Sequence, residues 1–188
     1  MRKAIFSILA LFFVLAIHAQ NTGLPQVDKS PMDVSYYPNN YPVLKIQNKA
    51  NGSPIARIIY SRPQKNGRTV FGNLIEYGQV WRMGANEATE IQFFQTVKLG
   101  KKKISAGRYT LYALVEKDKW TIILNKDTDT WGAFKYNADQ DLVRYEVPTG
   151  KCDDTVEYLS MLFDSPTKDT LNLVIEWDQV KVSVPFTL

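Results

Sequence analysis

Apolar and polar side chains alternate with a period of two along most of the chain after residue 55. The alternation is clearest in residues 109–115 and again in residues 171–186. Because successive side chains of a strand point to opposite faces of a sheet, this pattern predicts half-buried β-strands. No window of twelve or more residues has a clean helical period. The chain is therefore predicted to be all-β, with at most one short helical piece near residues 71–77.

Turn signals separate the alternating segments at intervals of about ten residues, which is typical of two packed antiparallel sheets. We expect about seven to nine strands. Their main ranges are 55–61, 91–99, 107–115, 120–124, 142–147, 156–163, 171–177 and 180–186. The last two ranges read as a hairpin around Asp178 and Gln179. The predicted architecture is a jelly-roll-like β-sandwich, and a closed barrel remains the alternative because spacing alone does not separate the two.

Residues 1–19 have the pattern of an export signal. Arg2 and Lys3 precede an apolar stretch over residues 4–17, and Ala19 marks the expected cleavage point. The apolar stretch is short for a membrane span, although an uncleaved anchor is the alternative. We therefore predict a periplasmic or extracellular protein with no transmembrane segment after cleavage. A proline-rich arm over residues 20–42 and a single domain over residues 43–188 would follow.

The charge balance disfavours nucleic acid as a partner. The chain has 23 Lys and Arg residues against 19 Asp and Glu residues, a formal charge of +4. Cleavage would remove Arg2 and Lys3 and lower that charge to +2. Affinity for nucleic acid depends mainly on phosphate neutralisation, so we predict no nucleic-acid partner.

Histidine and cysteine are nearly absent, and this excludes several kinds of active site. The only histidine is His18, within the predicted signal, and the only cysteine is Cys152. A zinc site therefore lacks its usual histidine and cysteine ligands. A Ser-His-Asp triad or a Cys-His pair lacks its histidine base. The acidic run at residues 127–129 lacks the other ligands of a calcium loop, and no phosphate-binding glycine loop is present. We predict no metal and no cofactor, which leaves carboxylate pairs as the available catalytic chemistry.

Three loops carry the candidate ligand-binding residues. The run VWRMGANEAT at residues 80–89 contributes Arg82, Asn86 and Glu87, an arrangement able to bind a polar ligand. The aromatic loop at residues 131–136 contributes Trp131 and Lys135, and the basic turn at residues 62–68 contributes Arg62. Structural alternatives stand beside each: an Arg82–Glu87 corner, a tryptophan that covers the end of the sandwich, and a solvated turn.

Several segments together resemble a known family of exported bacterial proteins, domain of unknown function 2911. They are ARIIYSRP at 56–63, VWRMGANEAT at 80–89, GRYTL at 107–111, WTIILN at 120–125 and WGA at 131–133. The resemblance extends over about residues 30 to 188. It implies secretion and a mostly β domain, and it supplies no agreed activity and no catalytic residues.

Three hypotheses about function follow. The first is a secreted β-sandwich that binds a small polar ligand, a glycan or a peptide through the six candidate residues. The second is a histidine-independent hydrolase that uses a carboxylate pair including Glu87. The third is an envelope-associated structural module that binds another protein through a sheet edge or through the aromatic segment at residues 36–41.

Overall fold

The computed structural model describes residues 23–188, so the predicted signal lies outside the described residues. Ten strands, one short α-helix and one 3₁₀ turn make up this part of the chain. The strands are β1 (Met32–Tyr37), β2 (Ala56–Ser61), β3 (Val80–Trp81), β4 (Glu90–Phe93), β5 (Val97–Leu99), β6 (Lys102–Ile104), β7 (Gly107–Val115), β8 (Lys119–Asn125), β9 (Asp141–Thr167) and β10 (Thr170–Thr187). The helix is α1 (Tyr41–Ile46) and the 3₁₀ turn is η1 (Ala138–Gln140). The prediction of an all-β fold with little helix is confirmed.

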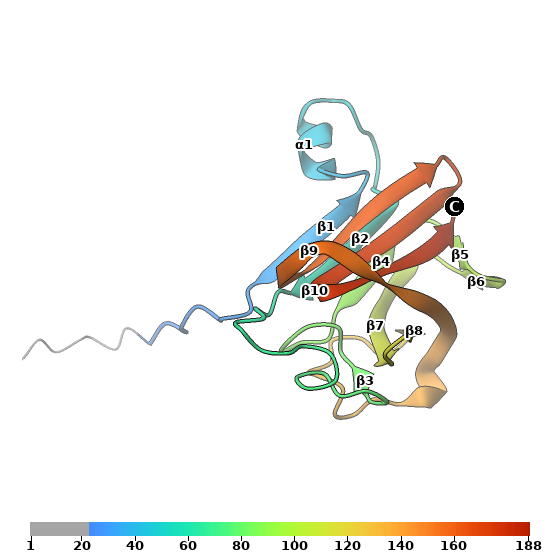
Figure 1. The fold of residues 1–188 in the computed structure, drawn as a ribbon. Coiled ribbons are helices and arrows are strands. Elements are labelled where there is room, and N and C mark those ends of the chain that lie inside the picture. The colour runs from blue at the N-terminus through green and yellow to red at the C-terminus, as the bar shows by residue number, and fades with distance from the viewer. Residues whose placement is uncertain (1–22) are drawn as a thin grey trace, which may run out of the picture.

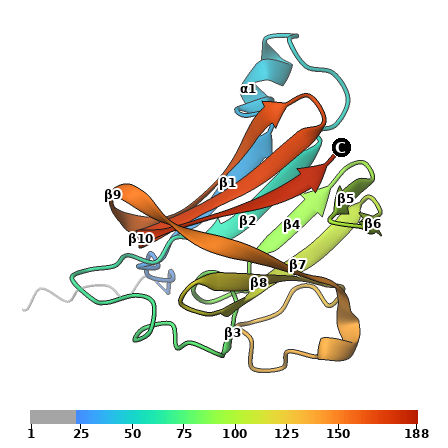
Figure 2. The ribbon, with the colours of Figure 1, turned by 45° about the vertical axis from the view of Figure 1, so that its right-hand side comes forward.

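The strands form two antiparallel layers that share β9. One layer has the order β1-β2-β4-β7-β8-β9, with β3 paired to β7, and the order continues as β9-β10-β5-β6 in the other. The first part of β9 pairs with β8 and the later part pairs with β10, and Figure 2 shows this long strand passing between the layers. The two ends of the strand order, β1 and β6, do not pair with each other. The fold is therefore an open sandwich, as predicted, and not a closed barrel (Figure 1).

The predicted strand ends near the C-terminus were wrong in two places. Residues 142–147 and 156–163 belong to one continuous strand, β9. Residues 171–177 and 180–186 are not the arms of a hairpin either, because both lie in β10 and pair with β9. Asp178 instead occupies an irregularity with a φ of 56°, where the register with β9 shifts. An extra residue in a strand reverses which side chains face inward, and this produces the change of parity that resembled a turn.

The predicted helical piece at residues 71–77 is also absent, because backbone contacts there form tight turns. Ile75 donates its N–H to the carbonyl oxygen of Val70, and Gly72 donates to Ile75. The short helix lies elsewhere, in α1, which follows the edge strand β1. In the described part of the chain, no helix combines the length and the hydrophobicity needed to cross a bilayer.

Four aromatic rings form the centre of the core beside β3. Trp81 stacks on Trp177 with ring centroids 6.0 Å apart and meets Trp120 edge to face at 5.8 Å. Phe71 contacts all three indoles. Aromatic pairs of this geometry stabilise a core beyond the area that they bury. The cluster fixes β3, and with it the VWRMGANEAT run that begins there.

Candidate functional site

The structure brings the first two predicted loops together at one end of the sandwich. Ala88 donates its N–H to the carbonyl oxygen of Thr130 at 3.0 Å, and Gly132 donates to Asn86 at 2.9 Å. Between these bonds, Glu87 and Trp131 form an antiparallel bridge. Residues 44 positions apart in sequence are therefore held in one short ladder of backbone hydrogen bonds.

Most of the VWRMGANEAT run is held by its own hydrogen bonds. Trp81 donates Nε1–H to the carbonyl oxygen of Gly84 at 3.2 Å, and Thr89 donates its hydroxyl to Met83 at 2.7 Å. The Ser61 hydroxyl on β2 accepts a hydrogen bond from the N–H of Ala85 at 2.7 Å. A Cβ at Gly84 would lie 2.8 Å from that hydroxyl oxygen. The run is therefore first of all a structural corner. Asn86 adopts the left-handed backbone conformation in this corner, with a φ of 59°.

Arg82 has a buried side-chain nitrogen that the local structure leaves without a partner. Its Nε is buried and has no hydrogen-bond acceptor, and no ion pair among residues 23–188 includes its guanidinium. The alternative in which Glu87 pairs with Arg82 is therefore wrong. Removal from water lowers the pKa of Arg82 from its usual value, which is the expected effect of burial on a cation.

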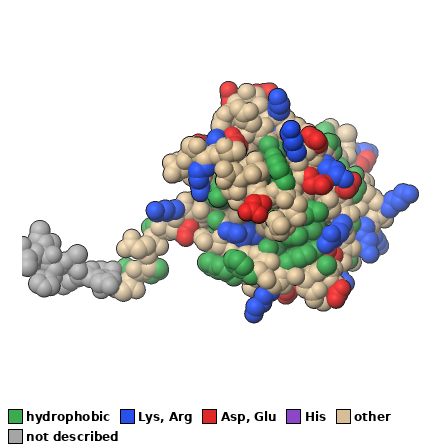
Figure 3. All heavy atoms as spheres, turned by 60° about the horizontal axis from the view of Figure 1, so that its bottom comes forward, with side chains coloured by type: hydrophobic (Ala, Val, Ile, Leu, Met, Phe, Trp, Pro, Cys, Tyr) green, Lys and Arg blue, Asp and Glu red, His purple; other side chains and the backbone are tan. Residues whose placement is uncertain are grey.

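Aromatic side chains surround a cavity of about 490 Å³ next to this corner, which we call the aromatic cavity. Trp131 and Phe134 line it and are 61% and 84% exposed. Tyr112 and Tyr136 also line it, with ring centroids 5.2 Å apart in an edge-to-face pair. Its polar lining includes Lys135 and residues 127–130. Figure 3 looks onto this end of the molecule, where hydrophobic side chains are exposed between charged ones.

Tyr136 is fixed by a network of charged groups behind the aromatic cavity. Its hydroxyl donates to Asp141 and accepts from Arg144 at 2.6 Å. Arg144 in turn donates Nε–H to Asp141 at 2.8 Å. Burial, followed by the hydrogen bond to the Asp141 carboxylate, raises the pKa of Tyr136 to about 12. The phenol therefore stays neutral at physiological pH and positions the loop.

A second cavity, of about 420 Å³, contains Arg82, and we call it the Arg82 cavity. Glu76 and Gln79 are its other polar lining residues. The remaining lining is apolar and consists of Leu74, Ile75, Val80, Trp81, Ala133 and Phe134. Phe134 lines both cavities, so the two are neighbours.

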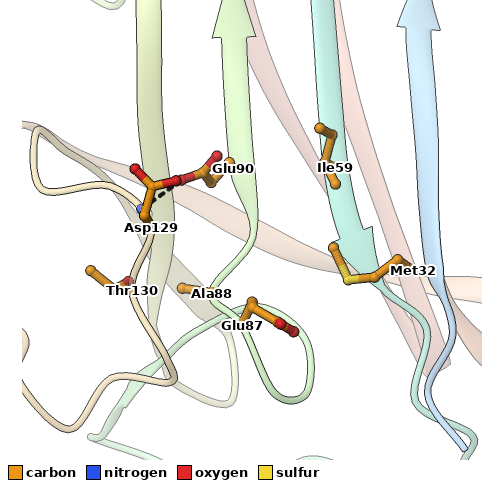
Figure 4. A pocket seen from close by; sticks show the side chains of 7 residues that line it. All are labelled: Met32, Ile59, Glu87, Ala88, Glu90, Asp129 and Thr130. Atoms are coloured by element: carbon orange, nitrogen blue, oxygen red, sulfur yellow. Dashed lines mark hydrogen bonds between the residues drawn. The ribbon is translucent and has the colours of Figure 1, made fainter. Parts of the chain in front are cut away.

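A further cavity of about 250 Å³, shown in Figure 4, is lined by three carboxylates, those of Glu87, Glu90 and Asp129. Glu90 and Asp129 lie next to each other there, and Glu90 accepts a hydrogen bond from the Asp129 N–H at 2.8 Å. Both also form ion pairs with Arg108. Hydrogen bonding to Arg108 lowers the pKa of Asp129 from its usual value. A general acid requires the opposite shift, so the arrangement favours a structural ion-pair network.

Arg62 contacts different parts of the fold from the other five predicted residues. Its guanidinium donates to Asp33 at 3.0 Å, to the carbonyl oxygen of Leu159 at 3.1 Å and to Ser160 at 2.9 Å. These bonds join β1 and β9 to the end of β2, and none of the three cavities described above has Arg62 in its lining. The sequence analysis did not select Phe134 or Tyr136 as ligand-binding residues. Both lie in the aromatic loop that it did select.

The comparisons with known proteins identify a family and no activity. The family described as protein of unknown function (DUF2911) matches residues 42–186. The chain belongs to this family. The DUF2911 match confirms the resemblance seen in the sequence and includes every residue that lines the aromatic and Arg82 cavities. No curated protein and no solved structure matches the chain.

Proposed function

We propose that this protein is an exported saccharide-binding module whose ligand lies in the aromatic cavity. The observation that carries the proposal is the pair of exposed rings, Trp131 and Phe134, at the mouth of a cavity of about 490 Å³. Large aromatic side chains are usually buried, and exposed ones that line a cavity are typical of binding sites. A pyranose ring has a face of C–H groups that stacks on such a ring.

The polar lining of the aromatic cavity suits the hydroxyl groups of a sugar. Asp127, Thr128 and Lys135 line the same cavity as the exposed rings and supply acceptors and donors. A few placed polar groups in a mostly apolar cavity fix the orientation of a ligand and provide specificity. The Tyr136–Asp141 hydrogen bond holds Tyr136, which lines the cavity, in position before a ligand arrives, and this reduces the entropy lost on binding.

The two other hypotheses have less support from the geometry. A carboxylate hydrolase needs one acid of raised pKa, whereas Glu90 and Asp129, the acids that line the same cavity as Glu87, form ion pairs with Arg108. Capture of a peptide at a sheet edge is opposed by exposed Lys102 and Lys103 on the edge strand β6, because charges on an edge discourage pairing.

A panel of neutral and acidic oligosaccharides, titrated by calorimetry, tests the proposal. Trp131→Ala and Phe134→Ala should each weaken binding of a panel member by about 10-fold, or ~1.4 kcal/mol. Tyr158→Ala is the matched control, because Tyr158 is 42% exposed and lines neither cavity. Binding that survives both loop substitutions, or that falls equally in the control, would contradict the proposal.

A further inference from the structure

Arg82 presents an unusual combination of burial and isolation. Its Nε lies out of contact with solvent without an acceptor, and its guanidinium makes no ion pair within residues 23–188. A buried polar group without a partner destabilises a fold, and more so when it is charged. A ligand that accepts hydrogen bonds would relieve this cost, and the cavity beside Arg82 provides the room for one.

Neighbouring groups do not complete the site. Glu76 lines the same cavity but forms neither an ion pair nor a hydrogen bond with Arg82. The backbone carbonyl of Arg82 is already used by the N–H of Thr89 at 3.0 Å, so the main chain is fixed while the side chain remains free. The planar fork of a guanidinium matches a carboxylate or a sulfate, and such pairs are among the strongest hydrogen-bonded contacts.

The Arg82 cavity also adjoins the proposed saccharide site, because the two cavities share a lining residue. Ala133 and Phe134 line the Arg82 cavity, and Phe134 also lines the aromatic cavity together with Lys135. A sugar chain bound against Phe134 therefore lies next to the linings that contain the Arg82 guanidinium and the Lys135 ammonium. Lys135 likewise makes no ion pair in the described part of the chain.

From this geometry we infer that the ligand is an anionic saccharide, whose carboxylate or sulfate ester accepts hydrogen bonds from the guanidinium of Arg82. The inference rests on the proposed function and narrows its ligand class. It also assigns Glu76 the role of a repelling neighbour, because its carboxylate lines the cavity that the anion would enter.

The test uses matched oligosaccharides titrated into the protein. The acidic probes are tetramers of galacturonate, mannuronate and glucuronate, each paired with its carboxyl-reduced form, and a sulfated galactan tetramer paired with its desulfated form. We expect at least one acidic probe to bind about 10-fold more tightly than its neutral partner. The uronate and sulfate arms separate the two sources of the oxyanion.

Variants locate the effect. Arg82→Gln should abolish the preference for the acidic probe and leave the neutral partner unchanged, and Arg82→Lys should retain only part of it because the fork is lost. Glu76→Gln should tighten binding of the acidic probe by about 3-fold, because it removes a charge of the same sign as the ligand, and the fold should be unchanged because Glu76 is exposed. Arg57→Gln is the matched control, since its Nε is also buried without a partner but its guanidinium donates to Gln92.

The outcomes separate the two proposals. Trp131-dependent binding with no preference for the acidic probe would overturn this inference and leave the proposed function intact. Acid-specific binding that needs Arg82 but not Trp131 or Phe134 would overturn the proposed function instead. Equal losses for acidic and neutral probes in Arg82→Gln would assign Arg82 a structural role, and no binding of any probe would overturn both proposals.

Discussion

Replacing Trp81 by alanine tests whether the VWRMGANEAT corner depends on the aromatic core. The Trp81 side chain is 4% exposed, contacts Phe71, Trp120 and Trp177, and donates its indole N–H to Gly84. Replacing a buried tryptophan by alanine typically costs about 3–5 kcal/mol through lost burial and the cavity left behind. This range already includes the loss of the hydrogen bond to Gly84, so we expect the free energy of unfolding to fall by ~4 kcal/mol.

The chain offers its own control for this measurement. Trp131 lies in the neighbouring loop and is 61% exposed, so Trp131→Ala should change the free energy of unfolding by less than about 0.5 kcal/mol. Urea unfolding followed by far-ultraviolet circular dichroism is the suitable assay, because tryptophan fluorescence is altered by the substitutions themselves. For a chain of this size, ~4 kcal/mol corresponds to a fall in Tm of roughly 8–16 °C. A loss below about 1.5 kcal/mol for Trp81→Ala, or similar losses for both variants, would refute the reasoning.

Three further measurements examine other parts of the fold. Gly84→Ala should destabilise the protein by about 1–3 kcal/mol, because the new Cβ would lie 2.8 Å from the Ser61 hydroxyl oxygen. Gly150→Ala is the control for the same urea assay and should be nearly neutral, because a Cβ there would lie 3.6 Å from its nearest neighbour. Arg62→Ala removes three hydrogen bonds between strands and should lower the free energy of unfolding by about 1–2 kcal/mol without weakening saccharide binding; a selective loss of binding would return Arg62 to the site. The pKa of Tyr136 is raised in the folded state to about 12, so its contribution to stability is complete below pH 10 and is lost as the pH rises from 10 to 12. Solvent screening reduces the effect to about 1 kcal/mol, and a Tyr136→Phe variant that shows the same slope as the parent protein over that range would contradict it.

The period-two pattern predicted the fold class because strand faces are determined locally. Where it was wrong, the missing information was long-range. The parity of the inward-facing side chains changes near Asp178, and both a hairpin and a bulge produce this change. The pairing of β10 with β9 on both sides of Asp178 decides between them, and pairing is a property of two segments together.

The candidate site was partly predictable for a similar reason. Unusual local composition singled out the corner at residues 80–89 and the aromatic loop at 131–136, and the structure joins them through the Glu87–Trp131 bridge. Arg62 shared that local signal, but its guanidinium is used by Asp33, Leu159 and Ser160. Whether a cation is free or occupied depends on its spatial neighbours, which the sequence does not give.

The length of β9 has a mechanical consequence. Because the first part of this strand bonds to β8 and the later part bonds to β10, an unbroken backbone joins the two layers, and separating either layer from β9 would break a row of hydrogen bonds. The 126–140 segment, which contains the aromatic loop, runs from the end of β8 to the start of β9. Both of its ends are therefore anchored in paired strands, so the proposed ligand would meet a surface whose shape is set before contact.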